Sequence, residues 1–250
     1  MSDKTTHNEV KKSKLLPWAT AIMLIVGVAV LAAIYWNRNV TVDELSFSGN
    51  VITETEILTE AANVEFGVHP DSLDLSAIVE GIERVDYVKS ATPYIEPNGE
   101  LNIQIKERNP IALLIKDGNR VYVDAEGVKL PIFEGKTFNL PLVYGFNAST
   151  NSDTLKSEAF KQISTFLTEA RQNKFGWITI SEVAYNKEEG VVALSQENGV
   201  KLLFGSNDFR IKLENWEAFY TEVIRVKGIQ TMQQVDLRFT NQVVKREGRI

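Results

Sequence analysis

The sequence predicts an α+β protein with a single N-terminal transmembrane helix, a small β-α-α-β-β domain, and a larger, mostly antiparallel α+β domain. Three observations lead to this fold class. A long uncharged run lies near the N-terminus, a short segment in the order β-α-α-β-β follows it, and strands then mix with amphipathic helices. The chain has 250 residues and no cysteine, and this length allows a core to form without disulfides.

The uncharged run, LLPWATAIMLIVGVAVLAAIYW, extends from Leu15 to Trp36. As a helix it would span roughly 33 Å, enough to cross a hydrocarbon core of about 30 Å. Trp18 and Trp36 lie near its ends, where aromatic side chains favour the membrane interface. A cleaved signal peptide would have a shorter apolar region, and a buried helix is rarely apolar on every face. We therefore expect residues 15–36 to form an uncleaved anchor in the lipid bilayer.

The charges beside this run predict its orientation. Only Arg38 follows it closely before the acidic residues Asp43 and Glu44, whereas four lysines precede it: Lys4, Lys11, Lys12 and Lys14. Because positive charge is concentrated on the cytoplasmic side of membrane helices, we expect residues 1–14 to form a short cytoplasmic tail. The bulk of the chain would then lie outside the cytoplasm.

The first folded domain is predicted over residues 40–109. Val42–Phe47 alternates apolar and polar residues, as a half-buried strand does. Thr53 and Glu56 have the spacing of a capping box, which would open a helix ending at Ala62. A second helix (74–82) and two strands (85–95 and 101–105), separated by a Pro-Asn-Gly turn, complete the domain.

The second domain is predicted over residues 110–250. Turn residues separate its strands, and apolar residues at helical spacing mark two helices. The expected strands are 111–116, 120–124, a short one after the turn at 124–127, 177–185, 190–195, 200–204, 234–239 and 242–245. The expected helices are 154–172 and one starting at Asp208, whose predicted buried set is Ile211, Trp216, Phe219, Val223 and Val226.

Several classes of chemistry are excluded by composition. The net charge of -6 and the lack of a basic cluster argue against nucleic-acid binding. The only histidines are His7 and His69, which cannot form a histidine metal site, and no nucleophile motif accompanies them. The acidic pairs Asp124/Glu126 and Glu188/Glu189 fall in predicted turns, where carboxylates are normally solvated. We therefore predict no catalytic residue, no metal, no cofactor and no small-molecule substrate.

A series of short motifs resembles one known family. The β-α-α-β-β segment after the anchor, with LSFSGN at Leu45–Asn50, looks like a POTRA domain. Further motifs resemble the FtsQ/DivIB cell-division proteins, and they occur in that family's order. They are Glu107-Arg108-Asn109-Pro110, Tyr122–Gly127, Leu140–Gly145, Asn198–Gly205 and Val235-Asp236-Leu237-Arg238-Phe239.

The resemblance implies a non-enzymatic divisome scaffold at the septum, in the inner (plasma) membrane of a bacterial cell. Such a scaffold binds FtsB/DivIC-type and FtsL-type proteins and is linked to peptidoglycan synthesis. Carried over by position, its partner-contacting residues would be Phe239, Asn241 and Gln242. The chain departs from the family here, since Gln242 replaces a frequent glycine and Glu247 replaces a tryptophan.

Expectations also follow for four other residues. Val235 and Leu237 are expected in the core of the terminal strand, and Lys212 lies near a basic position of the family. Arg238 could form either a structural ion pair or a partner contact. Two alternatives for the whole chain stay open: a generic POTRA-containing envelope interaction protein, or an envelope enzyme that acts on polysaccharide.

Overall fold

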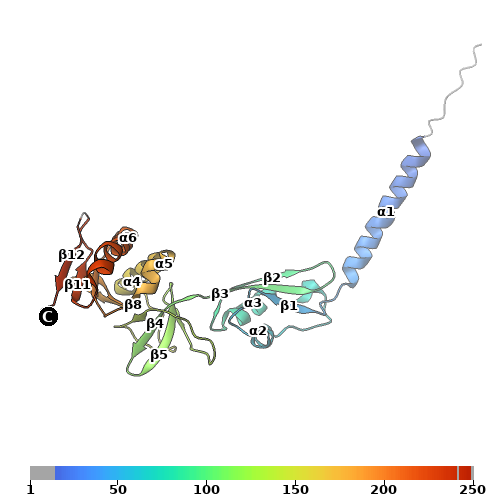
Figure 1. Cartoon of the computed structure of the whole chain (residues 1–250). Coiled ribbons are helices and arrows are strands. Elements are labelled where there is room, and N and C mark those ends of the chain that lie inside the picture. The colour runs from blue at the N-terminus through green and yellow to red at the C-terminus, as the bar shows by residue number, and fades with distance from the viewer. Residues whose placement is uncertain (1–14, 241, 249–250) are drawn as a thin grey trace, which may run out of the picture. The chain divides into compact units, whose positions relative to one another are not determined.

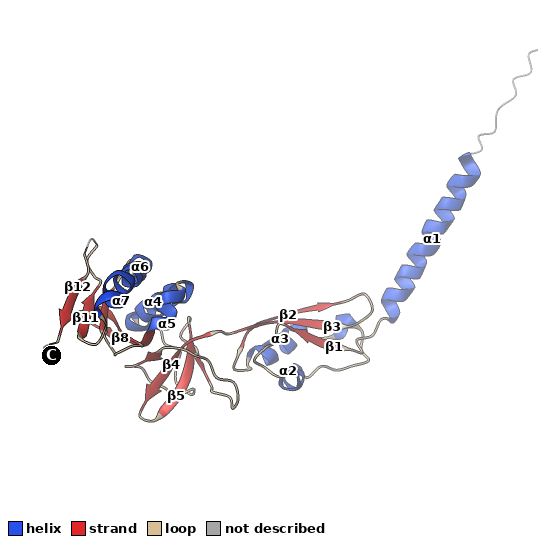
Figure 2. Ribbon diagram, in the orientation of Figure 1, coloured by secondary structure: helices blue, strands red, loops and turns tan. Residues whose placement is uncertain are grey.

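The computed structural model describes residues 15–240 and 242–248. By their contacts, the residues form two compact units. The N-terminal unit comprises residues up to 50, 54–84 and 90–105, and the C-terminal unit comprises 51–53, 85–89 and everything from 106 onward. Figures 1 and 2 show the helices and strands of both units.

Helix α1 (Leu15–Asn39) begins the N-terminal unit. Its last residue, Asn39, donates a side-chain hydrogen bond of 2.7 Å to the carbonyl oxygen of Tyr35, one turn earlier. Over the residues that the structure describes, no helix combines the length and the apolar character needed to cross a membrane.

The rest of the N-terminal unit is a three-stranded sheet with two helices. The strand order is β1-β3-β2, and β1 runs parallel to β3. Its core contains Leu58, Ile82, Leu101 and Ile103, all fully buried. The elements are β1 (Leu45–Ser48), α2 (Thr55–Ala62), the 3₁₀ turn η1 (Pro70–Ser72), α3 (Leu75–Glu83), β2 (Val88–Ile95) and β3 (Leu101–Glu107). The chain order β-α-α-β-β is therefore the predicted one.

The two helices of this unit begin differently. Asp74 caps α3, because its side chain accepts a 3.0 Å hydrogen bond from the Ala77 N–H. Helix α2 starts after Glu54, which makes no side-chain cap. The predicted capping box of Thr53 and Glu56 is thus wrong. The Thr53 N–H instead donates to the carboxylate of Glu107 at 2.7 Å.

The C-terminal unit contains a nine-stranded sheet in the order β12-β11-β10-β9-β8-β7-β4-β5-β6. Three neighbouring pairs, β10–β11, β4–β7 and β7–β8, are parallel and the others are antiparallel. The predicted α+β, mostly antiparallel character is confirmed. The strands are β4 (Pro110–Lys116), β5 (Asn119–Asp124), β6 (Lys129–Leu130), β7 (Leu142–Val143), β8 (Ile180–Asn186), β9 (Gly190–Ser195), β10 (Lys201–Gly205), β11 (Met232–Asp236) and β12 (Val244–Glu247).

Helices pack on one face of this sheet (Figure 2). The longest, α4, contacts β4, β8 and β9, and the core beneath the helices includes Phe166, Phe204 and Trp216. The helices are α4 (Glu158–Gln172), α5 (Lys174–Thr179), α6 (Phe209–Phe219), a π-helical turn η2 (Tyr220–Ile224) and α7 (Arg225–Lys227).

Two predictions fail in this unit. Residues 177–179 are helical instead of extended, because the Asn173 side chain caps α5 by accepting the Gly176 N–H at 2.7 Å. Ile211 and Val226, predicted as buried, are 46% and 78% exposed. Lys212 takes a buried position on the inner face of α6, and the π-helical turn shifts the helical register before Val226.

Candidate partner-binding edge

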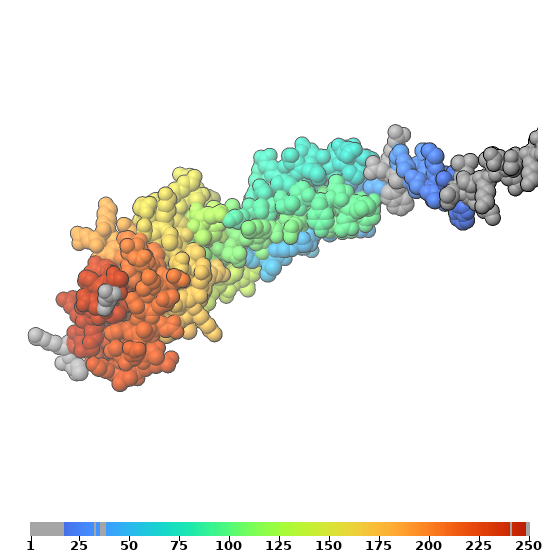
Figure 3. Space-filling view, turned by 90° about the horizontal axis from the view of Figure 1, so that it is seen from above, coloured from blue at the N-terminus to red at the C-terminus, as the bar shows by residue number. Residues whose placement is uncertain are grey.

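Strand β12 forms one end of the nine-stranded sheet. It pairs antiparallel with β11, and no other described strand pairs with its outer side. Three of its four residues are exposed, among them Val244 at 45%. Figure 3 shows the red C-terminal residues at the surface. An edge of this kind presents unpaired backbone N–H and C=O groups to which another chain can add a strand.

The predicted contact residues lie in the segment that connects β11 to β12, not within either strand. The Phe239 side chain is 45% exposed, and Gln242 is also exposed. Asn241 lies outside the described residues. The structure thus places Phe239 and Gln242 in one short segment leading into the free edge. Val235 and Leu237, predicted as core residues, are fully buried as expected.

An ion pair fixes the backbone where this segment leaves β11. The Arg238 guanidinium donates two hydrogen bonds to the Asp236 carboxylate, at 2.9 and 2.6 Å, and the Arg238 backbone N–H donates a third at 3.1 Å. Burial alone would raise the pKa of Asp236, but these bonds and the neighbouring positive charge lower it. Arg238 therefore has the structural ion-pair role that the sequence left open, and it orients the start of the exposed segment.

Lys212 is a buried cation beside this ion pair. Its Nζ donates hydrogen bonds to the carbonyl and side-chain oxygens of Asn207, at 2.6 and 2.9 Å. Burial lowers the pKa of Lys212, and the nearby carboxylates of Asp208 and Asp236 oppose that shift. Its donated hydrogen bonds hold the 205–208 loop, so in this structure it is not an exposed contact residue.

The first two residues of the motif Glu107-Arg108-Asn109-Pro110 hold neighbouring segments together by hydrogen bonds and ion pairs. The Glu107 carboxylate accepts backbone N–H groups of Val51, Ile52 and Thr53 at distances of 2.7–3.1 Å. Burial would raise the pKa of Glu107, yet these bonds lower it. Arg108 forms ion pairs with Asp124 at 2.9 Å and with Glu126.

The Asp-x-x-Gly turn of Tyr122–Gly127 is also structural. The Asp124 carboxylate accepts the N–H groups of Glu126 and Val128, both at 2.9 Å. Gly127 has φ +85°, and a Cβ there would lie 2.2 Å from the carbonyl oxygen of Leu155. The carboxylates of this turn therefore stabilise the fold. The expectation that both carboxylates are solvated is wrong for Asp124, which is buried, and both Asp124 and Glu126 pair with Arg108.

Two further residues of the edge were missed by the sequence analysis. The register places Val244 opposite Asp236 and Arg246 opposite Gln234, on the sheet face away from the core residue Val235. Side chains of an added strand would lie beside these two residues. The signal was the alternation along Val244–Glu247, which could be assigned to a face only once its register with β11 was known.

Among the described residues, we find no arrangement of side chains that favours catalysis or metal binding. No group of three or more His, Asp or Glu side chains there is arranged to hold a metal ion. His69 is the residue before η1, and its Nδ1 accepts the Asp71 N–H at 3.2 Å. The carboxylate of Glu189 pairs with Lys201 at 2.8 Å. The geometry of this unit is suited to strand addition at β12.

Residues 109–245 match the protein family described as "FtsQ/DivIB, C-terminal related". This match spans more than half of the chain and includes the 237–243 segment and the first two residues of β12. The chain belongs to the FtsQ/DivIB family. Since FtsQ/DivIB proteins are division scaffolds without enzymatic activity, the prediction that the chain is not an enzyme is confirmed by its family.

Individual FtsQ relatives resemble nearly the whole chain. The cell division protein FtsQ of Rhodothermus marinus is 28% identical over 234 residues, which cover 90% of this chain and 86% of that protein. The Salinibacter ruber FtsQ is 25% identical over 237 residues, 90% of each chain. The solved extracytoplasmic domain of DivIB from Geobacillus stearothermophilus is 20% identical with a TM-score of 0.33, covering 48% of this chain and 97% of that domain. The FtsQ relatives support a role in cell division.

Proposed function

We propose that the chain is a bitopic divisome scaffold. It binds FtsB/DivIC-type and FtsL-type membrane proteins at the septum and links them to peptidoglycan synthesis. The uncharged run of residues 15–36 serves as its single anchor in the inner membrane, with residues 1–14 in the cytoplasm. Residues 40–109 form its POTRA domain, and residues 110–250 form the partner-binding domain.

The observation that carries this proposal is the free edge of β12 next to the exposed Phe239. An extended partner segment adds to β12, and its backbone supplies hydrogen bonds while alternate side chains supply specificity. Phe239, Asn241 and Gln242 contact the partner beside the strand. The added strand itself meets Val244 and Arg246, which favours an apolar and an acidic side chain at the facing positions.

A double substitution tests the site. Phe239→Ala with Gln242→Arg removes an exposed aromatic and adds a charge, so we expect at least a ~10-fold loss of affinity for an FtsB-like partner in co-purification and titration. The matched control is Tyr94→Ala with Gln104→Arg, which alters an exposed aromatic and an exposed glutamine of the N-terminal unit. Unchanged binding by the first variant, with both variants folded, would refute the site.

The cellular role is tested by the location of an N-terminally tagged fusion through the division cycle. We expect the signal to concentrate at the constricting midcell, and depletion of the protein to give filaments. A uniform envelope signal with normal division would instead favour a generic POTRA-containing interaction protein.

A further inference from the structure

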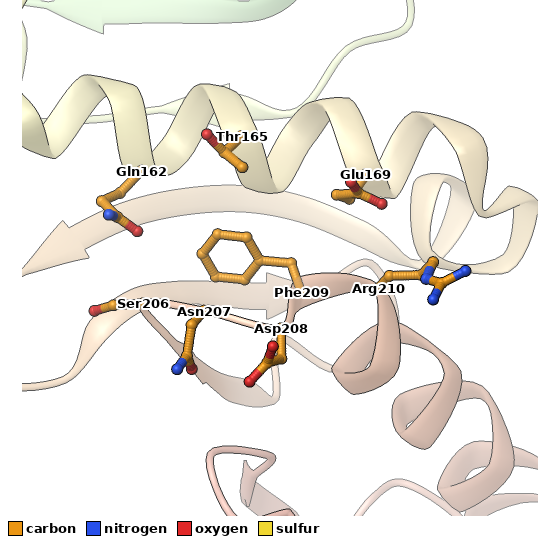
Figure 4. Close-up of a pocket in the computed structure, with 8 residues that line it drawn as sticks. All are labelled: Gln162, Thr165, Glu169, Ser206, Asn207, Asp208, Phe209 and Arg210. Atoms are coloured by element: carbon orange, nitrogen blue, oxygen red, sulfur yellow. The ribbon is translucent and has the colours of Figure 1, made fainter.

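Phe66 is an aromatic residue at the surface of the N-terminal unit, with 49% of its side chain exposed. Among the described residues, Phe239 is the only other exposed phenylalanine. The rest are buried or half-buried. Phe209, for example, borders a pocket between α4 and α6 (Figure 4), but it is only 5% exposed and belongs to the core. The proposed function uses Phe239 and assigns no role to Phe66.

The loop of residues 63–69, which carries this ring, is bonded to the chain just after α1. The Val42 N–H donates to the Val68 carbonyl oxygen, and the Gly67 N–H donates to the Val42 carbonyl oxygen, both at 2.9 Å. Gly67 has φ +76°, and a Cβ there would meet no other part of the chain within 4 Å. The tip of the loop is therefore open, while its base is fixed three residues after the end of α1.

A second turn lies at the same end of the N-terminal unit. A Cβ on Gly99 would collide with the Thr41 carbonyl oxygen, so the turn of residues 96–99 packs directly on the segment that follows α1. Pro97 and Asn98, at the tip of this turn, are exposed. The 63–69 loop and the 96–99 turn thus both lie where the chain connects this unit to α1.

The length of that connection limits how far the loop can be from a membrane, and this step rests on the proposed anchor at residues 15–36. From Trp36, where the uncharged run ends, the helix rises by about 5 Å to its last residue, and three extended residues add at most ~10 Å. The headgroup layer on each side of a bilayer is ~5–8 Å deep. Aromatic side chains at this level favour the membrane interface. We infer that the 63–69 loop inserts Phe66 into the outer surface of the bilayer that holds the anchor.

The charges around the ring determine which lipid surface it fits. Residues 40–44, 63–69 and 96–100 contain no lysine or arginine, and their acidic residues are Asp43, Glu44, Glu65, Glu96 and Glu100. Because anionic headgroups repel an acidic surface, the attraction comes from burial of the ring and not from charge. The loop therefore fits a zwitterionic lipid such as phosphatidylcholine better than an anionic lipid.

A depth measurement on the full chain tests the inference. The chain has no cysteine, so Phe66→Cys can be labelled with a single fluorophore, and phosphatidylcholine nanodiscs that contain a headgroup-spin-labelled lipid supply the quencher. We expect the label at position 66 to lose most of its emission. Ser48→Cys, at the exposed last residue of β1, is the matched control and should keep its emission.

The outcomes of this measurement separate the contact from the anchor. An unquenched label at position 66, on a chain that stays with the discs, would overturn the membrane contact and leave the proposed anchor standing. A chain that does not stay with the discs would overturn both. A label that is shielded only after a division partner is added would assign the loop to that protein and overturn the membrane contact.

Hydrogen exchange measures the contribution of the native ring. In phosphatidylcholine discs, the amides of residues 64–68 should exchange about 3–10-fold faster in the Phe66→Ser chain than in the native chain, because burial of the ring opposes opening of the loop. In phosphatidylglycerol discs this difference should shrink, since the acidic residues oppose the contact. Equal rates in phosphatidylcholine would overturn the inference. A difference that is the same in both lipids would also overturn it, because Phe66 would then act within the fold alone.

Discussion

Glu107 shows how much of this fold depends on a single carboxylate. It accepts three backbone N–H groups from residues 51–53, which precede it by more than 50 positions. Residues 51–53 lie outside the helices and strands, and a partly buried N–H without an acceptor is costly. The sequence motif around Glu107 therefore reflects a folding requirement, and the function of the edge depends on it only indirectly.

Replacement of this carboxylate should be destabilising. We expect Glu107→Ala to lower the free energy of unfolding by about 2 kcal/mol, since hydrogen bonds to a charged acceptor are lost. The amides of residues 51–53 should also exchange faster with solvent. Urea unfolding and hydrogen exchange measure the two effects, and Gln104→Ala, at an exposed position of β3, is the control. Equal stability of both variants would contradict the role.

The same group predicts a pH dependence. The pKa of Glu107 is lowered in the folded state from its ordinary value of 4.5, because the three N–H groups outweigh the effect of burial. Its contribution to stability is therefore fully present above about pH 4.5 and is lost as the pH falls through the lowered value. Glu107→Gln should remove this part of the acid sensitivity. A native chain and a Glu107→Gln chain with identical pH profiles between pH 3 and 6 would contradict the prediction.

A comparison of Gly118 with Gly127 distinguishes the cost of a left-handed backbone from the cost of a steric clash. Gly127 and Gly118 both have positive φ, at +85° and +81°, but only at Gly127 would a Cβ meet another backbone. Gly118→Ala should cost about 1–2 kcal/mol, the penalty of a left-handed residue. Gly127→Ala should cost clearly more, because the Leu155 carbonyl must move. Urea unfolding measures the loss of unfolding free energy in the two variants. Equal losses would contradict the prediction and would mean that the Leu155 segment moves aside at little cost in free energy.

At the scale of elements, the two sheets differ in how their edges are protected. Strand β2 ends the N-terminal sheet, but the Ala91 N–H is donated to the Glu83 carboxylate of α3 at 3.1 Å, and Pro93 has no N–H to donate. A proline and an occupied N–H block strand addition. Strand β12 has neither device among its described residues. This contrast supports the proposal that a partner adds to β12.

The protection of β2 can be measured. Glu83→Ala should speed the hydrogen exchange of the Ala91 amide by at least ~10-fold, because one hydrogen bond of about 1–1.5 kcal/mol is lost. Glu80→Ala alters another exposed acid of α3, which pairs with Arg84, and is the control. Unchanged protection of Ala91 would show that the carboxylate does not cover this edge.

Local patterns predicted most elements, and long-range contacts account for the errors. The alternation of Leu101, Ile103 and Ile105 correctly predicted β3, whose inward residues are all buried. Residues 177–179, predicted to begin a strand, belong to α5 instead, because Asn173 caps the helix and Gly176 packs against Leu213 of α6. The sequence around Gly176 does not indicate that it will pack against Leu213.

The candidate site was only partly predictable for the same reason. The motif ending in Phe239 pointed, through family resemblance, to the exposed segment that leads into β12. The contribution of Val244 and Arg246 depends on the register of β12 with β11, which residue spacing does not determine.

At the scale of the whole molecule, the charge of the edge differs from that of the chain. The chain has a net charge of -6, whereas β12 carries Lys245 and Arg246 against Glu247. We expect partner affinity to fall with rising salt, and Arg246→Glu to weaken binding by about 3–10-fold, because exposed charges mainly guide association. Lys116→Glu, on β4, is the control. A salt-independent affinity would argue against an acidic partner segment.

The two ends of the nine-stranded sheet have unequal access, and this limits the stoichiometry of any complex. The end opposite β12 is β6, only two residues long, with Lys129 and Leu130 both buried and Lys129 Nζ bound to the carbonyl oxygen of Asp153 at 3.0 Å. With one accessible end, the sheet of this chain would accept one partner strand, and it could not join two partners through its opposite ends.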